Sequence, residues 1–414
     1  GYGWGNDENC FGPGTSPYKI HVGSLRYTPV IGAFHAKNVT ITGSGAIDGQ
    51  GQTWWTNCTM CHYPPHNDSS RCEIASRPKL IETQFVDGLR VVGSSPGSPL
   101  TLRNSPFWTL TPSYSQNIYI ANLNISDPID QIGNTDGVNL DSCRNALVEN
   151  ILIKNVRMCT TCAPAFPLPC MQHTLTPSLF LSLSLSLSQS DDGVCIKSGL
   201  NGFGLNLGIP TENVLIRNIT CPVGGRGGFA LGSEMSGGMR NITYRDSVLD
   251  GERGITIKPS LGRGGYMQDV TFENIRTRAV GFHLGGDGER LMPGNNYVPL
   301  VANFAFINVG SVADNVFAVC KSMNQSKCFN ATVNGQTGAW PDALPPQTFA
   351  CKTTAKTLFG DVTLPWGVCI PHNAPVNLRA DYPNYGVATG AYSTLAECTK
   401  ACDRKMDEVR RNEY

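Results

Sequence analysis

The chain has 414 residues and a formal net charge of zero, with 32 Lys and Arg against 32 Asp and Glu. This balance provides no overall field that would attract nucleic acid or an anionic membrane, so neither is expected as a partner. No stretch approaches the ~18 uninterrupted apolar residues of a membrane span. Charged residues make up only 15% of the chain, whereas glycine numbers 45 and proline 27, which is typical of a turn-rich β protein.

Short strand-like runs recur along the chain, and each opens on a polar turn residue. The runs are NVTITG from Asn38, NIYIANLNI from Asn117, NALVENILI from Asn145, NVLIRNIT from Asn213, NITYRDSVL from Asn241 and DVTFENI from Asp269. From Asn117 onward the opening residues step by 28, 68, 28 and 28. A repeat of this length without helical periodicity is typical of a solenoid, in which each coil buries its apolar residues against the next. The predicted fold is all-β, a right-handed parallel β-helix over roughly residues 15–375 within one domain, 1–377.

The 68-residue step contains a segment unlike its surroundings. Residues 156–189 are rich in Pro and Cys and end in an alternating run, SLFLSLSLSLSQ. We interpret them as a translated intron, because Val-Arg fits a GT-initial donor site, Leu-Ser repeats fit a CT-rich tract and Gln fits a CAG acceptor. Removing these 34 residues shortens the step from 68 to 34, close to its neighbours. A genuine surface insertion between two coils is the alternative, since solenoids tolerate insertions.

Sixteen cysteines and eight Asn-x-Ser/Thr sequons favour an oxidising, secretory setting with several disulfides. Sequons also arise by chance in turns rich in Asn and Thr; here they lie at Asn38, Asn57, Asn67, Asn124, Asn218, Asn241, Asn324 and Asn330. We expect a secreted, monomeric glycoprotein of the extracellular space or cell wall. Residues 58–72 contain three Cys and two His at ligand-like spacing, for which a disulfide is favoured over zinc.

The C-terminal region changes character. Residues 378–414 form a Cys-containing tail that looks helical, and they resemble the truncated start of a small disulfide module. Within it, Cys398 and Cys402 are expected to be unpaired. Cys351 with Cys369, like Cys320 with Cys328, could close a late loop, although spacing alone does not determine connectivity.

Three carboxylates are candidates for chemistry: Asp136 in GNTDGVNLD, and Asp191 with Asp192 in SDDGVCIKSG. Without residues 156–189, Asp136 and Asp191 would be 21 residues apart, about one coil, so both would project from neighbouring rungs. Stacked carboxylates repel each other, and crowding raises the pKa of one member. One neutral acid beside ionised carboxylates is the equipment of glycoside hydrolysis. Each motif alone also reads as an ordinary turn, whereas both, one coil apart, favour function.

These motifs resemble those of glycoside hydrolase family 28, the polygalacturonase-like pectin hydrolases, and the resemblance covers most of residues 20–310. The matching stretches are GSGAIDGQGQTWW (43–55), RPKLIE (77–82), NSPFWTLTP (104–112), NTDGVNLDSCRN (134–145), SDDGVCIKSG (190–199), GSEMSGGMRNI (232–242) and GITIKPSLGRGGY (254–266). NTDG, DDG and GSEMSGG in this order form a highly specific combination. The resemblance implies a β-helical fold and an enzyme that hydrolyses α-1,4-galacturonan in pectin without a metal or an organic cofactor.

The resemblance also implies roles. Asp191 would be the general acid that protonates the glycosidic oxygen, while Asp136 and Asp192 would hold and deprotonate the attacking water. Such an inverting reaction places the acid and base carboxylates ~6.5–9.5 Å apart. Asn134 would help to shape the site, and Lys258 would pair with a sugar carboxylate, its alternative being a solvated surface lysine.

The chain departs from the family pattern where substrate is recognised. Arg226 in GRGG replaces the histidine of Gly-His-Gly-Gly, and as a bidentate cation it could bind the substrate carboxylate instead. Thr256 stands where many members have the arginine of Arg-Ile-Lys, and Thr111 stands where they have a histidine. The changes indicate an altered substrate or reduced activity.

Two other functions stay open at this point. A pectate-lyase-like enzyme would cleave by elimination with calcium, although the NTDG and DDG pair argues against it. A β-helical pectin-binding protein with little or no turnover, or a hydrolase of a related pectic polysaccharide, would fit the altered recognition residues. In each reading the partner is a pectic polysaccharide.

Overall fold

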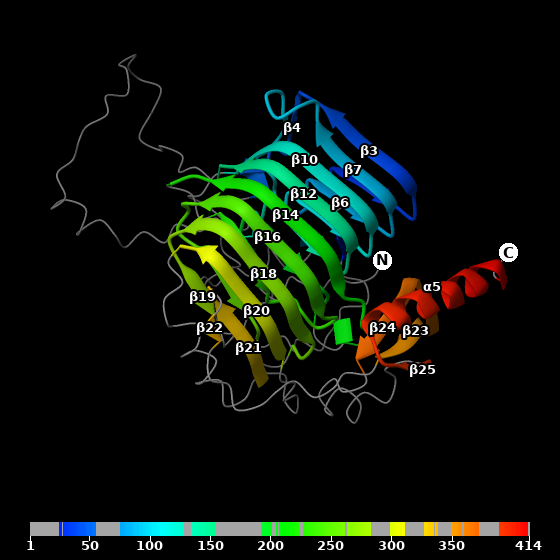
Figure 1. The fold of residues 1–414 in the computed structure, drawn as a ribbon. Helices are drawn as coiled ribbons and strands as arrows, with labels where there is room; N and C mark the ends of the chain where they lie inside the picture. The colour runs from blue at the N-terminus through cyan, green and yellow to red at the C-terminus, as the bar shows by residue number, and fades with distance from the viewer. Residues whose placement is uncertain are drawn as a thin grey trace, which may run out of the picture.

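The structure is a computed structural model that describes residues 25–26, 28–54, 75–127, 134–154, 192–200, 204–205, 207–223, 227–260, 263–282, 299–310, 327–334, 336–337, 349–357, 360–371 and 389–412. Most of its strands run side by side in two long sheets, and the chain alternates between the sheets along one elongated coil (Figure 1). Asp191, Arg226, residues 58–72 and residues 156–189 lie outside the described residues.

Each coil contributes one strand to each long sheet. The first sheet contains β3 (Lys37–Gly43), β7 (Asp87–Gly93), β10 (Gln116–Ser126), β12 (Arg144–Ile153), β14 (Thr211–Cys221), β16 (Met239–Leu249), β18 (Tyr266–Thr277), β20 (Leu300–Val309), β21 (Lys327–Val333) and β22 (Gln336–Thr337), with β4 (Ala46–Asp48) and β8 (Leu100–Arg103) pairing beside β10. The second contains β2 (Ile31–Phe34), β6 (Ile81–Gln84), β9 (Leu110–Ser113), β11 (Val138–Asp141), β13 (Val194–Lys197), β15 (Gly228–Gly232), β17 (Gly254–Lys258) and β19 (Val280–Phe282).

Neighbouring strands in these sheets are parallel, apart from the antiparallel β22 at one end. A short parallel pair, β1 (Leu25–Arg26) with β5 (Ala75–Ser76), precedes them. Parallel strands that alternate between two sheets with right-handed crossovers form a β-helix. The predicted right-handed parallel β-helix is confirmed.

The residues that open the predicted runs form a ladder of stacked side chains. Asn117, Asn145, Asn213 and Asn241 all have left-handed backbone, with φ of 57°, 56°, 56° and 53°. The amide of Asn145 donates to Asn117 (3.2 Å), that of Asn213 to Asn145 (3.2 Å) and that of Asn241 to Asn213 (2.8 Å). Asparagine suits this place because it tolerates φ > 0 and its amide both donates and accepts. The periodic Asn residues therefore mark the turn that starts each rung.

The 68-residue step does not interrupt the coil. Strand β12 pairs directly with β14, with Ala146 opposite Val214, and β11 pairs directly with β13, with Val138 opposite Val194. The ladder also crosses the step, because Asn213 bonds to Asn145. The rungs on either side of the step are thus consecutive coils of one solenoid.

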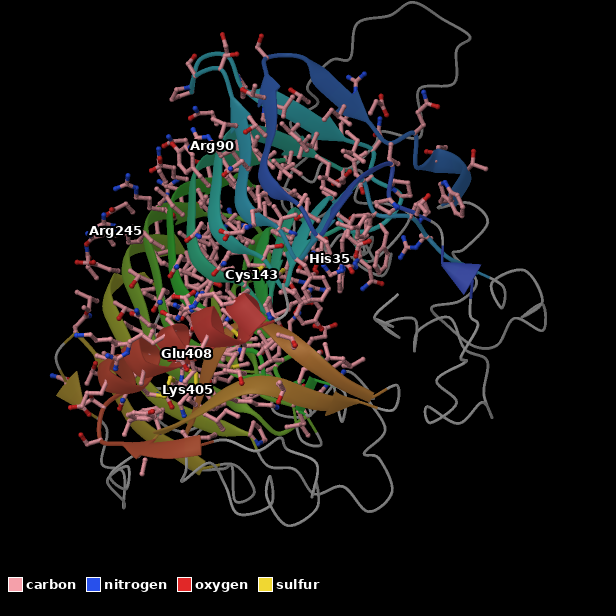
Figure 2. All side chains as sticks on the ribbon, turned by 90° about the vertical axis from the view of Figure 1, so that its right-hand side faces the viewer. His35, Arg90, Cys143, Arg245, Lys405 and Glu408 are labelled. Atoms are coloured by element: carbon pink, nitrogen blue, oxygen red, sulfur yellow. A yellow bond between two sulfur atoms is a disulfide. The ribbon has the colours of Figure 1, made fainter. Side chains whose placement is uncertain are left out.

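Apolar side chains fill the interior of the coil. Inward residues such as Val148, Ile216 and Tyr244 are fully buried and stack on one another along the axis. The aromatic rings of Tyr244 and Phe272 continue the stack, with centroids 5.1 Å apart. In Figure 2, Cys143 lies within the coil whereas Arg90 and Arg245 lie on its outer surface. Burial of these stacked residues between rungs is what stabilises the fold.

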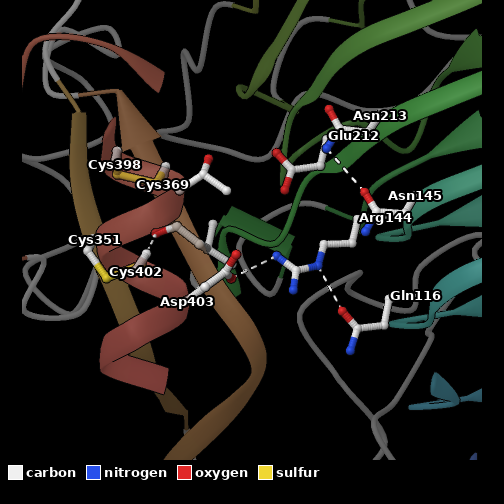
Figure 3. Close-up of polar contacts among 12 residues, drawn as sticks. Gln116, Arg144, Asn145, Glu212, Asn213, Cys351, Cys369, Cys398, Cys402 and Asp403 are labelled. Atoms are coloured by element: carbon white, nitrogen blue, oxygen red, sulfur yellow. Dashed lines mark hydrogen bonds and ion pairs between the residues drawn. A yellow bond between two sulfur atoms is a disulfide. The ribbon is translucent and has the colours of Figure 1, made fainter. Parts of the chain in front are cut away.

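The C-terminal region forms a small disulfide-linked layer. Strands β23 (Phe349–Thr357), β24 (Gly360–Pro371) and β25 (Thr389–Tyr392) form an antiparallel sheet, and helix α5 (Leu395–Asn412) packs on it. Disulfides join Cys351 to Cys402 and Cys369 to Cys398 (Figure 3).

The expected cysteine pairing in this layer is wrong. Cys351 and Cys369 face each other across β23 and β24, but each bonds to the helix instead of to the other. Cys398 and Cys402, which were expected to be unpaired, lie one helical turn apart and meet both strands. The two bridges therefore fasten α5 to the hairpin.

Buried polar contacts attach this layer to the coil. Arg144 of β12 donates to Gln116 (2.8 Å) and pairs with Asp403 of α5 (3.2 Å), as Figure 3 shows. Arg240 of β16 donates to the carbonyl of Cys369 (2.9 Å), and Lys352 donates to the carbonyl of Leu207 (3.0 Å). The C-terminal layer thus packs against the side of the β-helix.

None of the helices in the described residues is both long and apolar enough to span a bilayer.

We predict that the ladder makes a measurable contribution to stability. Replacing Asn213 by Ala removes its side-chain hydrogen bonds to Asn145 and Asn241. It also places Ala, which has no polar side chain to offset the backbone strain, at φ 56°. The expected loss of unfolding free energy is roughly 2–4 kcal/mol. Asn213→Gly, which keeps the backbone relaxed, should lose less. Chemical denaturation of both variants measures the difference, and equal losses would show that backbone conformation is not part of the ladder's role.

Candidate active site

Asp136 and Asp192 lie on neighbouring rungs at the same edge of the second sheet. Each stands two residues before a strand, and those strands pair in register through Val138 and Val194. The backbone joins them closely, because the N–H of Gly137 donates to the carbonyl of Asp192 (3.1 Å). Both side chains are buried, with 2% of each residue exposed. The structure therefore brings two of the three predicted carboxylates together, while Asp191 lies outside the described residues.

Two cations hold Asp192. Lys258 Nζ lies 2.6 Å from one carboxylate oxygen, and Arg253 Nη1 lies 3.1 Å from the other. Arg253 and Lys258 both lie at β17, so they reach Asp192 across the intervening rung of β15. Burial by itself raises the pKa of Asp192, but Lys258 and Arg253 outweigh it and hold that pKa well below its usual range. Asp192 is therefore an ionised carboxylate, which can accept a hydrogen bond from water but cannot act as an acid.

A third cation lies beside Asp136. Lys197 of β13 places Nζ 3.6 Å from a carboxylate oxygen of Asp136 and 2.8 Å from one of Glu234, which follows β15. Burial favours the neutral form of Lys197, but Glu234 and Asp136 outweigh it and raise the lysine pKa well above its usual value. Burial likewise opposes the charge on Glu234, but Lys197 and Arg263 lower its pKa to about 2. Lys197 and Glu234 are thus held in their charged forms, and Asp136 lies beside the charged Lys197.

The wall of the site is aromatic and sulfur-bearing. Lys197 Nζ lies 4.6 Å from the ring centroid of Trp108, and Lys79 Nζ lies 5.1 Å from the same centroid. The thiol of Cys195 donates to Asp136 at 3.5 Å. Burial and the charge of Asp136 raise the pKa of this thiol well above its usual value, so it stays protonated. Cys195 therefore acts here as a hydrogen-bond donor and not as a nucleophile.

The predicted substrate-binding residues are placed unequally. Lys258 has 16% of its side chain exposed and belongs to the charge cluster, so the alternative of a solvated surface lysine is wrong. Asn134 is half-buried with φ 64° and lies two residues before Asp136, beside the cluster. Arg226 lies outside the described residues. Substrate binding by Asn134, Lys258 and Arg226 stays a prediction.

Sequence reasoning assigned no role to four residues that complete the site. Lys197, Glu234 and Trp108 lie inside the quoted motifs, where their types were visible but their contacts were not. Arg253 lies three residues before Thr256 and supplies a cation near the place where the family arginine is missing. No motif marks it, because its contact with Asp192 depends on the register of three rungs.

The described residues contain no group of three or more His, Cys, Asp or Glu side chains arranged to hold a metal ion. The arrangement is suited to holding a water molecule against a pair of carboxylates, since each carboxylate lies beside positive charge.

Comparison with known proteins agrees with the motifs. Residues 13–164 match the model of glycosyl hydrolases family 28. The chain is also 34% identical over 257 residues to a probable polygalacturonase from Vitis vinifera, covering 62% of this chain and 42% of that protein. The resemblance to family 28 is confirmed.

More distant relatives extend the comparison. A polygalacturonase from Juniperus ashei is 24% identical over 241 residues, covering 57% of this chain and 36% of that protein. The chain thus spans about two-fifths of the length of these curated relatives. Among solved structures, the exopolygalacturonase of Thermotoga maritima has a TM-score of 0.51 at 22% identity, covering 75% of this chain and 73% of that chain, which supports the β-helix fold.

The charge of Glu234 predicts a pH-dependent stability. Because its folded pKa of about 2 lies below the ordinary value of 4.5, its contribution is complete above pH 4.5 and is lost as pH falls toward 2. Glu234→Gln should therefore lower the unfolding free energy by roughly 3 kcal/mol above pH 4.5, and by progressively less below it. Denaturant titrations of both proteins from pH 3 to 7 measure this; a difference that does not change with pH would contradict it.

Proposed function

We propose that this chain is a secreted hydrolase that cleaves α-1,4-galacturonosidic bonds of pectin with inversion at the anomeric carbon. The observation that carries the proposal is the pair of buried carboxylates on neighbouring rungs, Asp136 and Asp192, with cations beside both. The match of residues 13–164 to the family 28 model supports the substrate class, and so does the similarity to polygalacturonases. The disulfides of the C-terminal layer support secretion.

In the proposed mechanism, Asp136 and Asp192 hold a water molecule whose oxygen attacks the anomeric carbon. Its proton passes to a carboxylate of the pair, while Asp191 donates a proton to the glycosidic oxygen and the bond to the leaving sugar breaks. Rungs of a β-helix are ~4.8 Å apart, so side chains of adjacent coils can flank a sugar and a water. Lys258 and Arg226 would bind sugar carboxylates, and Asn134 would shape the site. The chain is proposed to act as a monomer.

We also propose that residues 156–189 are absent from the functional protein. The connection from β12 to β13 has 40 residues (154–193), and without those 34 it would have 6, the length of the connection from β14 to β15 (222–227). The uninterrupted ladder across this step supports the same view. The segment ends at Gln189, with only Ser190 before Asp191, so an insertion there could displace the acid. The full chain is therefore expected to be less active than the shortened one.

The test is release of reducing ends from polygalacturonate by a variant lacking residues 156–189. We expect activity that falls by at least about 1,000-fold in Asp136→Asn, Asp191→Asn and Asp192→Asn, because each removes a group that handles a proton in the transition state. Thermal unfolding of every variant controls for folding.

Other outcomes would be equally informative. Binding of polygalacturonate without release of reducing ends would replace the hydrolase with a pectin-binding protein, a reading that the 2% exposure of Asp136 and Asp192 favours. An unsaturated product, detected by its ultraviolet absorbance and lost on chelation, would indicate a lyase.

A further inference from the structure

Lys197 connects three successive rungs through its charge. Its side chain starts from β13, reaches back to Asp136 before β11 and forward to Glu234 after β15. The two contacts differ: 2.8 Å to Glu234 is a short charge-assisted hydrogen bond, whereas 3.6 Å to Asp136 lies just beyond hydrogen-bond range. Glu234 therefore fixes the position of the ammonium, and Asp136 receives its positive charge without being tied to it.

The surroundings make this charge effective. Lys197 is 5% exposed, and the face of Trp108 covers its ammonium at 4.6 Å. Away from bulk water, the attraction between two opposite charges is several times stronger than at an exposed surface. A buried cation at this distance favours the charged form of a neighbouring carboxylate.

We propose that Lys197 is a positioning residue that keeps Asp136 ionised as a water-activating base, and that Glu234 is the anchor that holds Lys197 in place. The inference rests on the proposed function, in which a carboxylate of the pair accepts a proton from water, and it assigns that proton to Asp136. It gives the GSEMSGG motif a task, because Glu234 is its acidic residue. It also gives the lysine of SDDGVCIKSG a task that is separate from substrate binding by Lys258.

Other charged and titratable groups surround the pair and contribute to the same field. Among the described residues they are Lys79 before β6, Asp141 on β11, Asp192 before β13, Cys195 on β13, Arg253 and Lys258 at β17, and Arg263 after it. Each of them stays unchanged in the variants below, so a difference between variants reports Lys197 and Glu234.

The variants must separate charge from folding. Lys197→Met alone would leave the largely buried Glu234 without its cation, and breaking one side of a buried pair strongly destabilises the fold. The double variant Lys197→Met/Glu234→Gln removes both charges, so neither member of the pair is left without its counter-charge. Lys197→Arg restores the cation and serves as the rescue control. All are made in the protein lacking residues 156–189, with thermal unfolding as the folding control.

The first readout is the pH profile of kcat/KM on polygalacturonate. In the double variant we expect the acidic limb to move to higher pH by about 1–3 pH units, with KM changed less than kcat, and in Lys197→Arg we expect the limb to return toward that of the parent. A folded double variant whose acidic limb coincides with that of the parent would overturn the proposal.

The second readout does not depend on activity. The change in unfolding free energy caused by Asp136→Asn is measured against pH in the parent and in the double variant. If Lys197 stabilises the charged Asp136, the replacement destabilises the parent near pH 6 but is neutral or stabilising in the double variant, where burial alone opposes the charge. Equal effects in both backgrounds would refute the role of Lys197, whereas an inactive parent with unequal effects would refute only the proposed function.

Discussion

The in-register stacking of parallel rungs is the constraint on which the rest of this structure depends. Rungs ~4.8 Å apart place equivalent residues directly on top of one another, so every side chain must tolerate a similar neighbour. Apolar residues satisfy this in the interior, as Val148 and Ile216 do. Asparagine satisfies it at the turns, because each amide donates to the one before and accepts from the one after. Carboxylates cannot satisfy it alone, since like charges repel.

The candidate site follows from the same constraint. Asp136 and Asp192 are stacked, and the chain compensates with cations that reach in from other rungs: Lys197 toward Asp136, and Arg253 and Lys258 toward Asp192. The desolvation that would neutralise a lone buried carboxylate is thereby offset. A fold that repeats one strand after another can in this way hold two ionised carboxylates side by side, which is what activation of a water molecule requires.

The sequence predicted the coil better than it predicted the site's partners. The spacing of Asn117, Asn145, Asn213 and Asn241 was sufficient, because one turn residue recurs once per coil and its backbone needs φ > 0. The cysteine pairing failed because Cys398 and Cys402 face two strands at once, an arrangement set by how the helix packs. Arg253 was missed for a related reason: its contact with Asp192 crosses the rung of β15 and depends on register, which no local motif encodes.

The most direct test of the central claim, that two ionised carboxylates deliver water to the face opposite the leaving group, is the anomeric form of the first product. Proton NMR of oligogalacturonate, recorded within the first minutes after the enzyme is added, distinguishes the two anomers of the new reducing end before they equilibrate. Inversion at an α-linkage predicts that the β-anomer forms first. Initial formation of the α-anomer would show retention, with a carboxylate attacking the sugar directly, and would contradict the account given for Asp136 and Asp192.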